Sequence, residues 1–348
     1  MIADVVNKEE EEDFTARSVQ LQLQGNWTTW CNFIKNDLSW KTLLAQPQNL
    51  TSFCIRATYD TLPSPSNLRR WSLEESAECH LCEKKTCTTA HILGACKVAV
   101  NQGRITYRHD SILSLLAESI KSFLLSYKPI PSTPSFQKIN FIKEGGKVPI
   151  KKISVDQGIL FQADDWTMLV DLETQLVVPT FLAITALRPD ILIFSKSKRI
   201  VILIELTSPC EENFEAWHKM KINKYVSLCA EMRLNKWNVK FFAVEVGARG
   251  YCAESMRCCL FKLGLSSKVT KSALKSFSSC ALRCSYYIWL SRNSKLWECH
   301  EKFENKNFIL KRFDPKASQP VYRKSKTYKI PARSKKLIET SPSVCLLA

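Results

Sequence analysis

Two acidic residues in the sequence have a spacing suited to sharing one divalent metal ion. Asp190 follows Arg188 and Pro189, and Glu205 comes after fourteen intervening residues, inside the apolar run 200–206. The apolar runs predict two strands, and a hairpin between them would bring both carboxylates near one end of a sheet. Mg²⁺ prefers oxygen ligands, and a bound metal ion acidifies water. The spacing therefore predicts a magnesium site at Asp190 and Glu205.

A lysine interrupts the apolar side of the helix that is predicted after these strands. Lys221 projects into the middle of an apolar stripe, and Lys224 lies at the edge of that stripe. The stripe consists of Phe214, Trp217, Tyr225, Leu228 and Met232. Because an ammonium group is costly to bury without a partner, Lys221 is expected to meet Asp190 and Glu205. Two carboxylates and an amine predict phosphodiester hydrolysis, with Lys221 ranked before Lys224 as the catalytic amine.

A purely structural interpretation of the same residues stays open. Glu205 would then be a satisfied acid on an edge strand, Pro189-Asp190 an ordinary turn, and Lys221 a side chain that reaches past the sheet edge to solvent. A single acid inside a run of five aliphatic residues favours the functional interpretation, because charge is rarely buried without a partner.

Three cysteines and one histidine have the spacing of a zinc knuckle. The four residues are Cys79, Cys82, His91 and Cys96. Thiolates and imidazole in a tetrahedral arrangement select zinc, which would supply the folding energy that so short a segment lacks. The pattern therefore predicts a structural Zn²⁺. Cys87 remains an alternative ligand, unligated thiols remain a second alternative, and His80 is interpreted as a bystander.

The composition indicates a folded chain that binds a polyanion. Its 348 residues are 45% apolar, which is enough for two modest domains with a buried core. Fifty Lys and Arg against thirty-three Asp and Glu give a net charge of +17, which favours nucleic acid through counterion release. Ten of the basic residues lie between Lys311 and Lys336, with the single acid Asp314. DNA is the leading expected partner, RNA is a further one, and an anionic membrane is the alternative.

The chain lacks the sequence features of a membrane-spanning or secreted protein. No stretch reaches the roughly 18 apolar residues that cross a bilayer, and the start lacks the order of a signal peptide. Fifteen cysteines without a secretion signal favour reduced thiols in an intracellular protein, and the basic tract is typical of nuclear import. The last four residues, which begin with Cys345, fit a loose prenylation pattern, but chance explains them better than a lipid anchor.

Changes in composition along the chain predict six segments. They are a disordered acidic start (1–13), a helical linker (14–70), the zinc knuckle with a following helix (71–128), a second linker (129–152), an α/β domain (153–300) and a basic disordered tail (301–348). Asp110 is expected to be the N-cap of the helix that follows the knuckle. Strands are expected at 166–170, 177–184, 191–194, 200–206 and 241–246.

At these residues the chain resembles the C-terminal part of early-branching non-LTR retrotransposon polyproteins. That family carries a CCHC zinc knuckle followed by a restriction-like endonuclease of the PD-(D/E)xK fold. Its signature is Lys or Arg, then Pro and Asp, then an acid after twelve to fourteen residues, which fits Arg188-Pro189-Asp190 and Glu205. The resemblance covers residues 70–300 in outline. Further similar segments are 91–93, 103–104, 205–209, 211–213, 224–225 and 245–250.

The resemblance implies an α/β fold in which a restriction-endonuclease-like mixed sheet, flanked by helices, follows a small helical zinc-knuckle module. It also implies a Mg²⁺-dependent hydrolase that nicks target DNA, so that a reverse transcriptase can prime on the exposed end. A nucleic-acid-binding protein whose nuclease fold is inactive is the alternative. A truncated element and a captured host gene both remain open as the origin of the chain.

Two departures from the family pattern bear on these expectations. Thr207 occupies the position, two residues after the second acid, where the family has a lysine, so the amine must come from the helix, as Lys221 allows. No reverse transcriptase domain is recognised, and the similarity of residues 163–165 to part of its active-site motif is interpreted as coincidence. Asp165 and Asp171 are candidates for a third carboxylate, and Arg249 is expected to meet a phosphate or to cap nearby carbonyls.

Overall fold

The fold is built on a mixed sheet of four strands. The computed structural model describes residues 2–34, 46–126 and 158–297. In spatial order the strands are β1 (Trp166–Val170), β2 (Ile191–Ser195), β3 (Ile200–Thr207) and β4 (Asn238–Glu245). β2 is antiparallel to both β1 and β3, whereas β4 runs parallel to β3. The expected α/β class is confirmed, while the expected linker at 129–152, the tail at 301–348 and Cys345 lie outside the described residues.

The connections between strands explain their directions. β2 and β3 are joined by a tight turn at 196–199, which permits only antiparallel pairing, as the sequence predicts. The helix α7 (Phe214–Leu234) crosses from the end of β3 to the start of β4, which permits parallel pairing. Every residue of β2 and β3 is buried, as is typical of strands that are covered on both faces.

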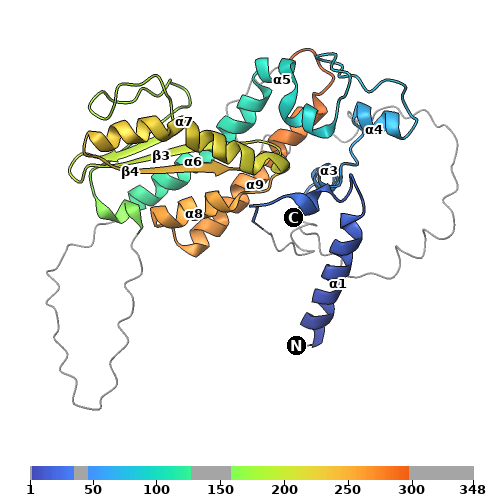
Figure 1. Ribbon diagram of the computed structural model, residues 1–348, viewed down its shortest axis with the longest axis horizontal. Coiled ribbons are helices and arrows are strands. Elements are labelled where there is room, and N and C mark those ends of the chain that lie inside the picture. Colours follow the sequence, from blue (N-terminus) through green and yellow to red (C-terminus); the bar gives the residue numbers. More distant parts are fainter. Residues whose placement is uncertain (1, 35–45, 127–157, 298–348) are drawn as a thin grey trace.

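Helices cover both faces of the sheet (Figure 1). Three of them pack on one face, in a core that includes Ile202 and Ile204 of β3. They are α6 (Arg104–Ser126), α8 (Glu254–Leu263) and α9 (Ser267–Leu290). α7 packs on the opposite face, against Val201 and Leu203. Because successive strand residues point to opposite faces, Glu205 belongs to the α7 face.

A smaller helical module, residues 46–101, packs against the C-terminal half of α9. Its elements are α3 (Gln48–Thr58), α4 (Pro65–Arg70), the π-type turn η2 (His91–Ala95) and α5 (Lys97–Asn101). One apolar cluster joins Phe53 and Leu93 of the module to Leu282 and Trp289 of α9. The ring centroids of Phe53 and Tyr286 are 5.2 Å apart. The module is therefore fixed to a helix that also supports the sheet.

A buried arginine joins three parts of the chain. Arg108 of α6 is 0% exposed, and its guanidinium donates to the Leu93 carbonyl of the small module. It also donates to the hydroxyl and carbonyl of Ser208, just after β3, and to the hydroxyl of Ser285 in α9. These four hydrogen bonds are 2.8 to 3.1 Å long and satisfy a charge that burial would otherwise penalise.

The start of the chain is helical, which corrects the prediction of a disordered acidic start at 1–13. The helix α1 spans Ile2–Val19 and so crosses the expected boundary at residue 13. Glutamate is a good helix former, and the charges of Lys8 and Glu12 lie 3.8 Å apart across one turn. Phe14 stacks on Trp27 of the short helix η1 (Asn26–Thr29), with 6.2 Å between ring centroids. The acidic run is therefore part of a helix held by local contacts.

The expected strand at 177–184 is also wrong. These residues form a turn, in which the Leu182 amide donates to the Pro179 carbonyl. Val178 and Leu182 are apolar because they pack into the core beneath α7, not because they pair with a neighbouring strand. β4 is present but begins at Asn238, earlier than the predicted strand at 241–246.

Replacing Arg108 with alanine is expected to lower the free energy of unfolding by about 3 kcal/mol, because the carbonyls of Leu93 and Ser208 would lose a charged donor while buried. Urea unfolding of the full chain measures the loss. The exposed Arg69 provides the matched control, and its alanine variant is expected to unfold like the unmodified protein. Equal stability of the two variants would contradict the joining role of Arg108.

Candidate functional site

The cysteines and the histidine of the knuckle pattern come together in the small module. The ligand atoms of Cys79, Cys82, His91 and Cys96 all lie within 4.8 Å of one another. Cys79 Sγ is 3.9 Å from Cys96 Sγ, and Cys82 Sγ is 3.3 Å from His91 Nε2. A tetrahedral zinc ion with ordinary bond lengths separates two sulfurs by about 3.8 Å, and sulfur from nitrogen by about 3.5 Å. These four residues can therefore hold a metal ion such as zinc.

The local backbone positions these four side chains. Cys79 and Cys82 lie on a tight turn, in which the Glu83 amide donates to the Cys79 carbonyl. The turn η2 begins at His91 and is followed directly by Cys96, so the two ligands stand at the two ends of one π-type turn. The sequence predicts a short helix here, and the wider turn is the form that the structure adopts.

The pKa shifts of two of the four side chains suit a cation, whereas burial raises the pKa of Cys96 to about 11. Burial alone would raise the pKa of Cys79, but hydrogen bonds from the backbone of Cys82 and Leu81 lower it below its ordinary value. Burial and the charge of Lys84 lower the pKa of His91, which favours the neutral imidazole. Since metal ligands bind in their deprotonated forms, both shifts favour metal binding.

Two neighbouring residues stand outside this ligand group. Cys87 is buried close by, and burial together with the charge of Cys79 raises the pKa of its thiol. His80 is exposed although it lies between two ligands in the sequence. The structure therefore favours the ligand set with Cys96 and His91 over the alternative that uses Cys87.

A buried carboxylate forms the centre of the second site. Glu205 of β3 is only 2% exposed, and three residues of α7 contact its carboxylate. Lys221 Nζ lies 2.6 Å from Glu205 Oε1, and Lys224 Nζ lies 3.3 Å from the same atom. The Tyr225 hydroxyl donates to Glu205 Oε2 at 2.7 Å. The inward-facing lysine that the sequence predicts therefore meets the acid that it is expected to meet.

Asp190 lies beside Glu205 at the end of the neighbouring strand. The β2–β3 register pairs Ile191 with Ile204, which sets Asp190 opposite Glu205. Asp190 Oδ2 accepts from the Leu206 amide at 2.6 Å. The negative charges of Glu205 and Asp190, in addition to burial, raise the pKa of Tyr225. We name Asp190, Glu205, Lys221 and Lys224 the carboxylate–lysine site.

The two candidates for a third carboxylate lie at opposite ends of the sheet. The amide of Asp171, just after β1, donates to the Asp190 carbonyl at 2.9 Å, and the charge of Asp171 also raises the pKa of Tyr225. Asp165 instead accepts from Ser195 Oγ at 2.5 Å and from the Ser197 amide at 2.9 Å, at the hairpin turn. Only Asp171 is placed near the carboxylate–lysine site.

The carboxylates of this site do not by themselves enclose a metal ion. Among the described residues, Asp171, Asp190 and Glu205 do not form a group whose oxygens all lie within 4.8 Å of one another. Mg²⁺ typically keeps several waters and binds through one or two carboxylates plus substrate phosphates. The magnesium site that the sequence predicts at Asp190 and Glu205 therefore stays a prediction.

His109 is a residue of this site that sequence reasoning missed. Its Nε2 lies 3.5 Å from Asp190 Oδ2, and its Nδ1 donates to Asp110 at 2.9 Å. Burial alone would lower the pKa of His109, but hydrogen bonds to Asp110 and Asp190 raise it to about 10. The expectation that Asp110 is an N-cap is wrong, because α6 begins at Arg104 and already contains this residue. The adjacent polar residues Arg108 and His109 in a largely apolar helix were the sequence pattern that could have indicated a buried polar contact here.

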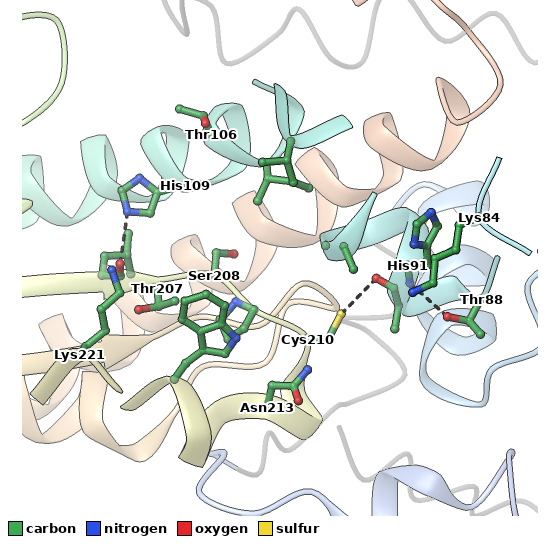
Figure 2. A pocket seen from close by; sticks show the side chains of 18 of the residues that line it. Lys84, Thr88, His91, Thr106, His109, Thr207, Ser208, Cys210, Asn213 and Lys221 are labelled. Atoms are coloured by element: carbon green, nitrogen blue, oxygen red, sulfur yellow. Dashed lines mark hydrogen bonds between the residues drawn. The ribbon is translucent and has the colours of Figure 1, made fainter. Parts of the chain in front are cut away.

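A cleft of about 770 Å³ connects the two sites (Figure 2). Lys84 and His91 lie on the side of the small module, and His109, Thr207 and Lys221 lie on the side of the sheet. None of the described residues that line it is acidic. The cleft therefore presents a mainly apolar surface with a few basic side chains between the cysteine–histidine cluster and the carboxylate–lysine site.

Arg249 does not face this cleft and has a structural role. Its Nη1 lies 2.8 Å from Glu211 Oε2 and 2.8 Å from Glu212 Oε2, and its Nε donates to the Ala57 carbonyl. The side chain is 4% exposed and also lies over the Trp30 ring. The expectation that Arg249 meets a phosphate is therefore not met, because carboxylates and a carbonyl satisfy it.

No family model matches the chain, and no curated protein sequence does so either. Within the described ranges, none of the helices combines the length and hydrophobicity that crossing a membrane requires.

Replacing Cys96 with serine is expected to remove the bound metal, because one of four ligands is lost. Elemental analysis should find about one zinc per chain in the unmodified protein and much less in this variant. Cys87→Ser is the matched control, since Cys87 is buried beside the cluster but lies outside the ligand group, and it should retain the zinc. Loss of zinc from the Cys87 variant alone would show that Cys87, and not Cys96, is the fourth ligand.

Replacing His109 with asparagine is expected to lower the free energy of unfolding by about 2 kcal/mol at neutral pH, because charge-assisted bonds to two aspartates are lost. Since its folded-state pKa of about 10 lies above the ordinary 6.5, this stabilisation is complete below 6.5 and disappears as the pH rises through 10. Urea unfolding of both proteins across that interval, without divalent metal, measures the difference. A difference that grows with pH would contradict the charged histidine.

Proposed function

We propose that the chain is a metal-dependent DNA endonuclease module derived from a non-LTR retrotransposon, with a zinc knuckle that contributes to nucleic-acid binding. The reaction is phosphodiester hydrolysis that nicks a DNA strand, and the expected location is the nucleus. The mixed sheet flanked by helices is compatible with a PD-(D/E)xK restriction-like fold, as is the small helical module that precedes it. The chain carries no recognised reverse transcriptase domain.

The contact between Lys221 and Glu205 is the observation that carries this proposal. Asp190 just before β2, Glu205 of β3 and Lys221 of α7 lie at one end of the sheet, and Glu205 is almost completely buried. A structural ion pair needs neither a second acid nor a second lysine there. Asp190 and Lys224 are both present, and the cleft opens next to them.

Each residue of the site has a role in the proposed reaction. A Mg²⁺ ion held by Asp190 and Glu205 would supply a Lewis acid and an acidified water. Lys221 orients the attacking water and offsets negative charge that develops on the phosphorus. Lys224, which is more exposed than Lys221, contacts the strand near the scissile phosphate. His109 holds the Asp190 carboxylate in place until the metal and substrate enter.

An inactive nucleic-acid-binding protein is the second candidate, and one observation favours it. Lys221 and Lys224 both neutralise Glu205, and His109 neutralises Asp190. A metal ion must compete with these cations, and a chain that has lost catalysis would keep the same ion pairs for stability. DNA or RNA would still bind through the cationic surface, with affinity that falls as salt rises.

Incubation of the purified full chain with supercoiled plasmid and Mg²⁺ tests the proposal. Asp190→Asn and Glu205→Gln are each expected to reduce nicking by about 100-fold or more, because each removes a charged metal ligand. Lys221→Met should have a similar effect, and Lys224→Met a smaller one.

Asp165→Asn is the matched control, because Asp165 lies at the hairpin end of the same sheet. Its variant should nick plasmid at the unmodified rate. Binding of plasmid without nicking by the unmodified protein, with Mg²⁺ or Mn²⁺, would establish the inactive binding protein instead. Nicking that survives both carboxylate substitutions would reject the assigned site.

A further inference from the structure

The cleft between the small module and the carboxylate–lysine site carries an inference about what the protein binds. We propose that the cleft holds one unstacked nucleotide of a single-stranded polynucleotide, with its base against the indole of Trp217. This inference rests on the proposed function only in placing that nucleotide beside the carboxylate–lysine site. The binding itself requires no cleavage.

The charge of the cleft suits a phosphate backbone. Lys84, Lys221 and His109 line it, and no aspartate or glutamate does so among the described residues. Lys221 is paired with Glu205, and His109 with Asp110 and Asp190, so Lys84 is the lining cation without an acidic partner within the described residues. Lys84 is exposed on the knuckle turn and lies across the cleft from Lys221 (Figure 2). A strand that passes between them would place phosphates near a lysine on each side, and grooves of this kind track single-stranded nucleic acid.

The size of the cleft suits one nucleotide. Its volume of about 770 Å³ falls within the range of about 300–1,000 Å³ that is typical of small-molecule sites. A base-paired duplex cannot enter a site of that size, whereas a nucleotide that has left its stack can. The volume of the cleft therefore favours an unpaired base over a base pair.

Trp217 provides the surface on which such a base can stack. It lies in the first turn of α7, lines the cleft and is 37% exposed, although helical periodicity predicts it in the apolar stripe. An indole that the core does not enclose, beside lysines, is suited to base stacking in any sequence. Thr207 also lines the cleft, and its buried Oγ1 has no hydrogen-bond partner among the described residues.

Binding of the full chain to fluorescent oligonucleotides, in EDTA-free buffer with Ca²⁺ in place of Mg²⁺, tests this inference. Trp217→Ala is expected to weaken binding of single-stranded DNA by about tenfold, and Trp217→Phe much less. Trp71→Ala is the matched control, because Trp71 is 38% exposed and does not line the cleft. It should bind like the unmodified protein.

An oligonucleotide with a run of abasic sites tests whether Trp217 contacts a base, because this strand keeps the phosphates but lacks the bases. The unmodified protein should bind it about as weakly as Trp217→Ala binds the normal strand, and Trp217→Ala should lose nothing further on the abasic strand. Equal loss from Trp217→Ala on normal and abasic strands would overturn the inference. So would equal effects of the Trp217 and Trp71 substitutions.

Two further arms separate the strand type and the role of charge. Single-stranded RNA of the same sequence should show the same dependence on Trp217, and its affinity relative to DNA identifies the sugar preferred. Lys84→Ala should reduce the salt dependence of binding by about one ion, whereas Lys85→Ala, at an exposed neighbour outside the cleft, should change it less. If the protein nicks no plasmid but shows this binding pattern, the endonuclease proposal is rejected and the proposed nucleotide-binding site is supported.

Discussion

A carboxylate buried in a central strand is the constraint on which the arrangement of the sheet and its covering helix depends. Glu205 is surrounded by aliphatic residues of β3, and an unpaired charge there would cost several kcal/mol. Lys221, Lys224 and Tyr225 satisfy it from a single helix, at positions three and four residues apart. α7 must therefore lie along this face with one particular side inward, which in turn fixes the crossover to the parallel strand β4.

Arg108 imposes a second constraint, which relates the small module to this sheet. Its guanidinium binds the carbonyl of Leu93, two residues after His91 of the cysteine–histidine cluster, and both acceptors of Ser208, just after Glu205 and Thr207 along the chain. The cysteine–histidine cluster and the carboxylate–lysine site are therefore held on one frame, with the cleft between them. A binding site built from both halves needs such a frame, because a small displacement would separate its walls.

Short-range patterns in the sequence predicted the parts of the site that local structure determines. The hairpin between β2 and β3 sets Asp190 against Glu205, and turn geometry brings Cys79 to Cys82. The polar pair of Arg108 and His109 marks the position in the sequence, but the contact of His109 with Asp190 could not be predicted, because it depends on how α6 packs against the sheet. The inward position of Trp217 was a wrong prediction, since helical spacing shows which residues share a side but not where the neighbouring layer ends. The strand at 177–184 failed because a loop that packs into a core has the same apolar composition as a strand.

The packing of α9 has a consequence for the order in which the chain acquires its structure during synthesis. Phe53 packs on Tyr286, and Leu113 of α6 shares its core with Phe277. Residues that are synthesised early therefore cannot complete their packing until α9 has been synthesised. Contacts of such high sequence separation slow folding, because a long loop must close before they form. Until the ribosome releases α9, the exposed apolar surfaces of the N-terminal half lack their natural cover, and chaperones are the cellular factors that recognise such surfaces.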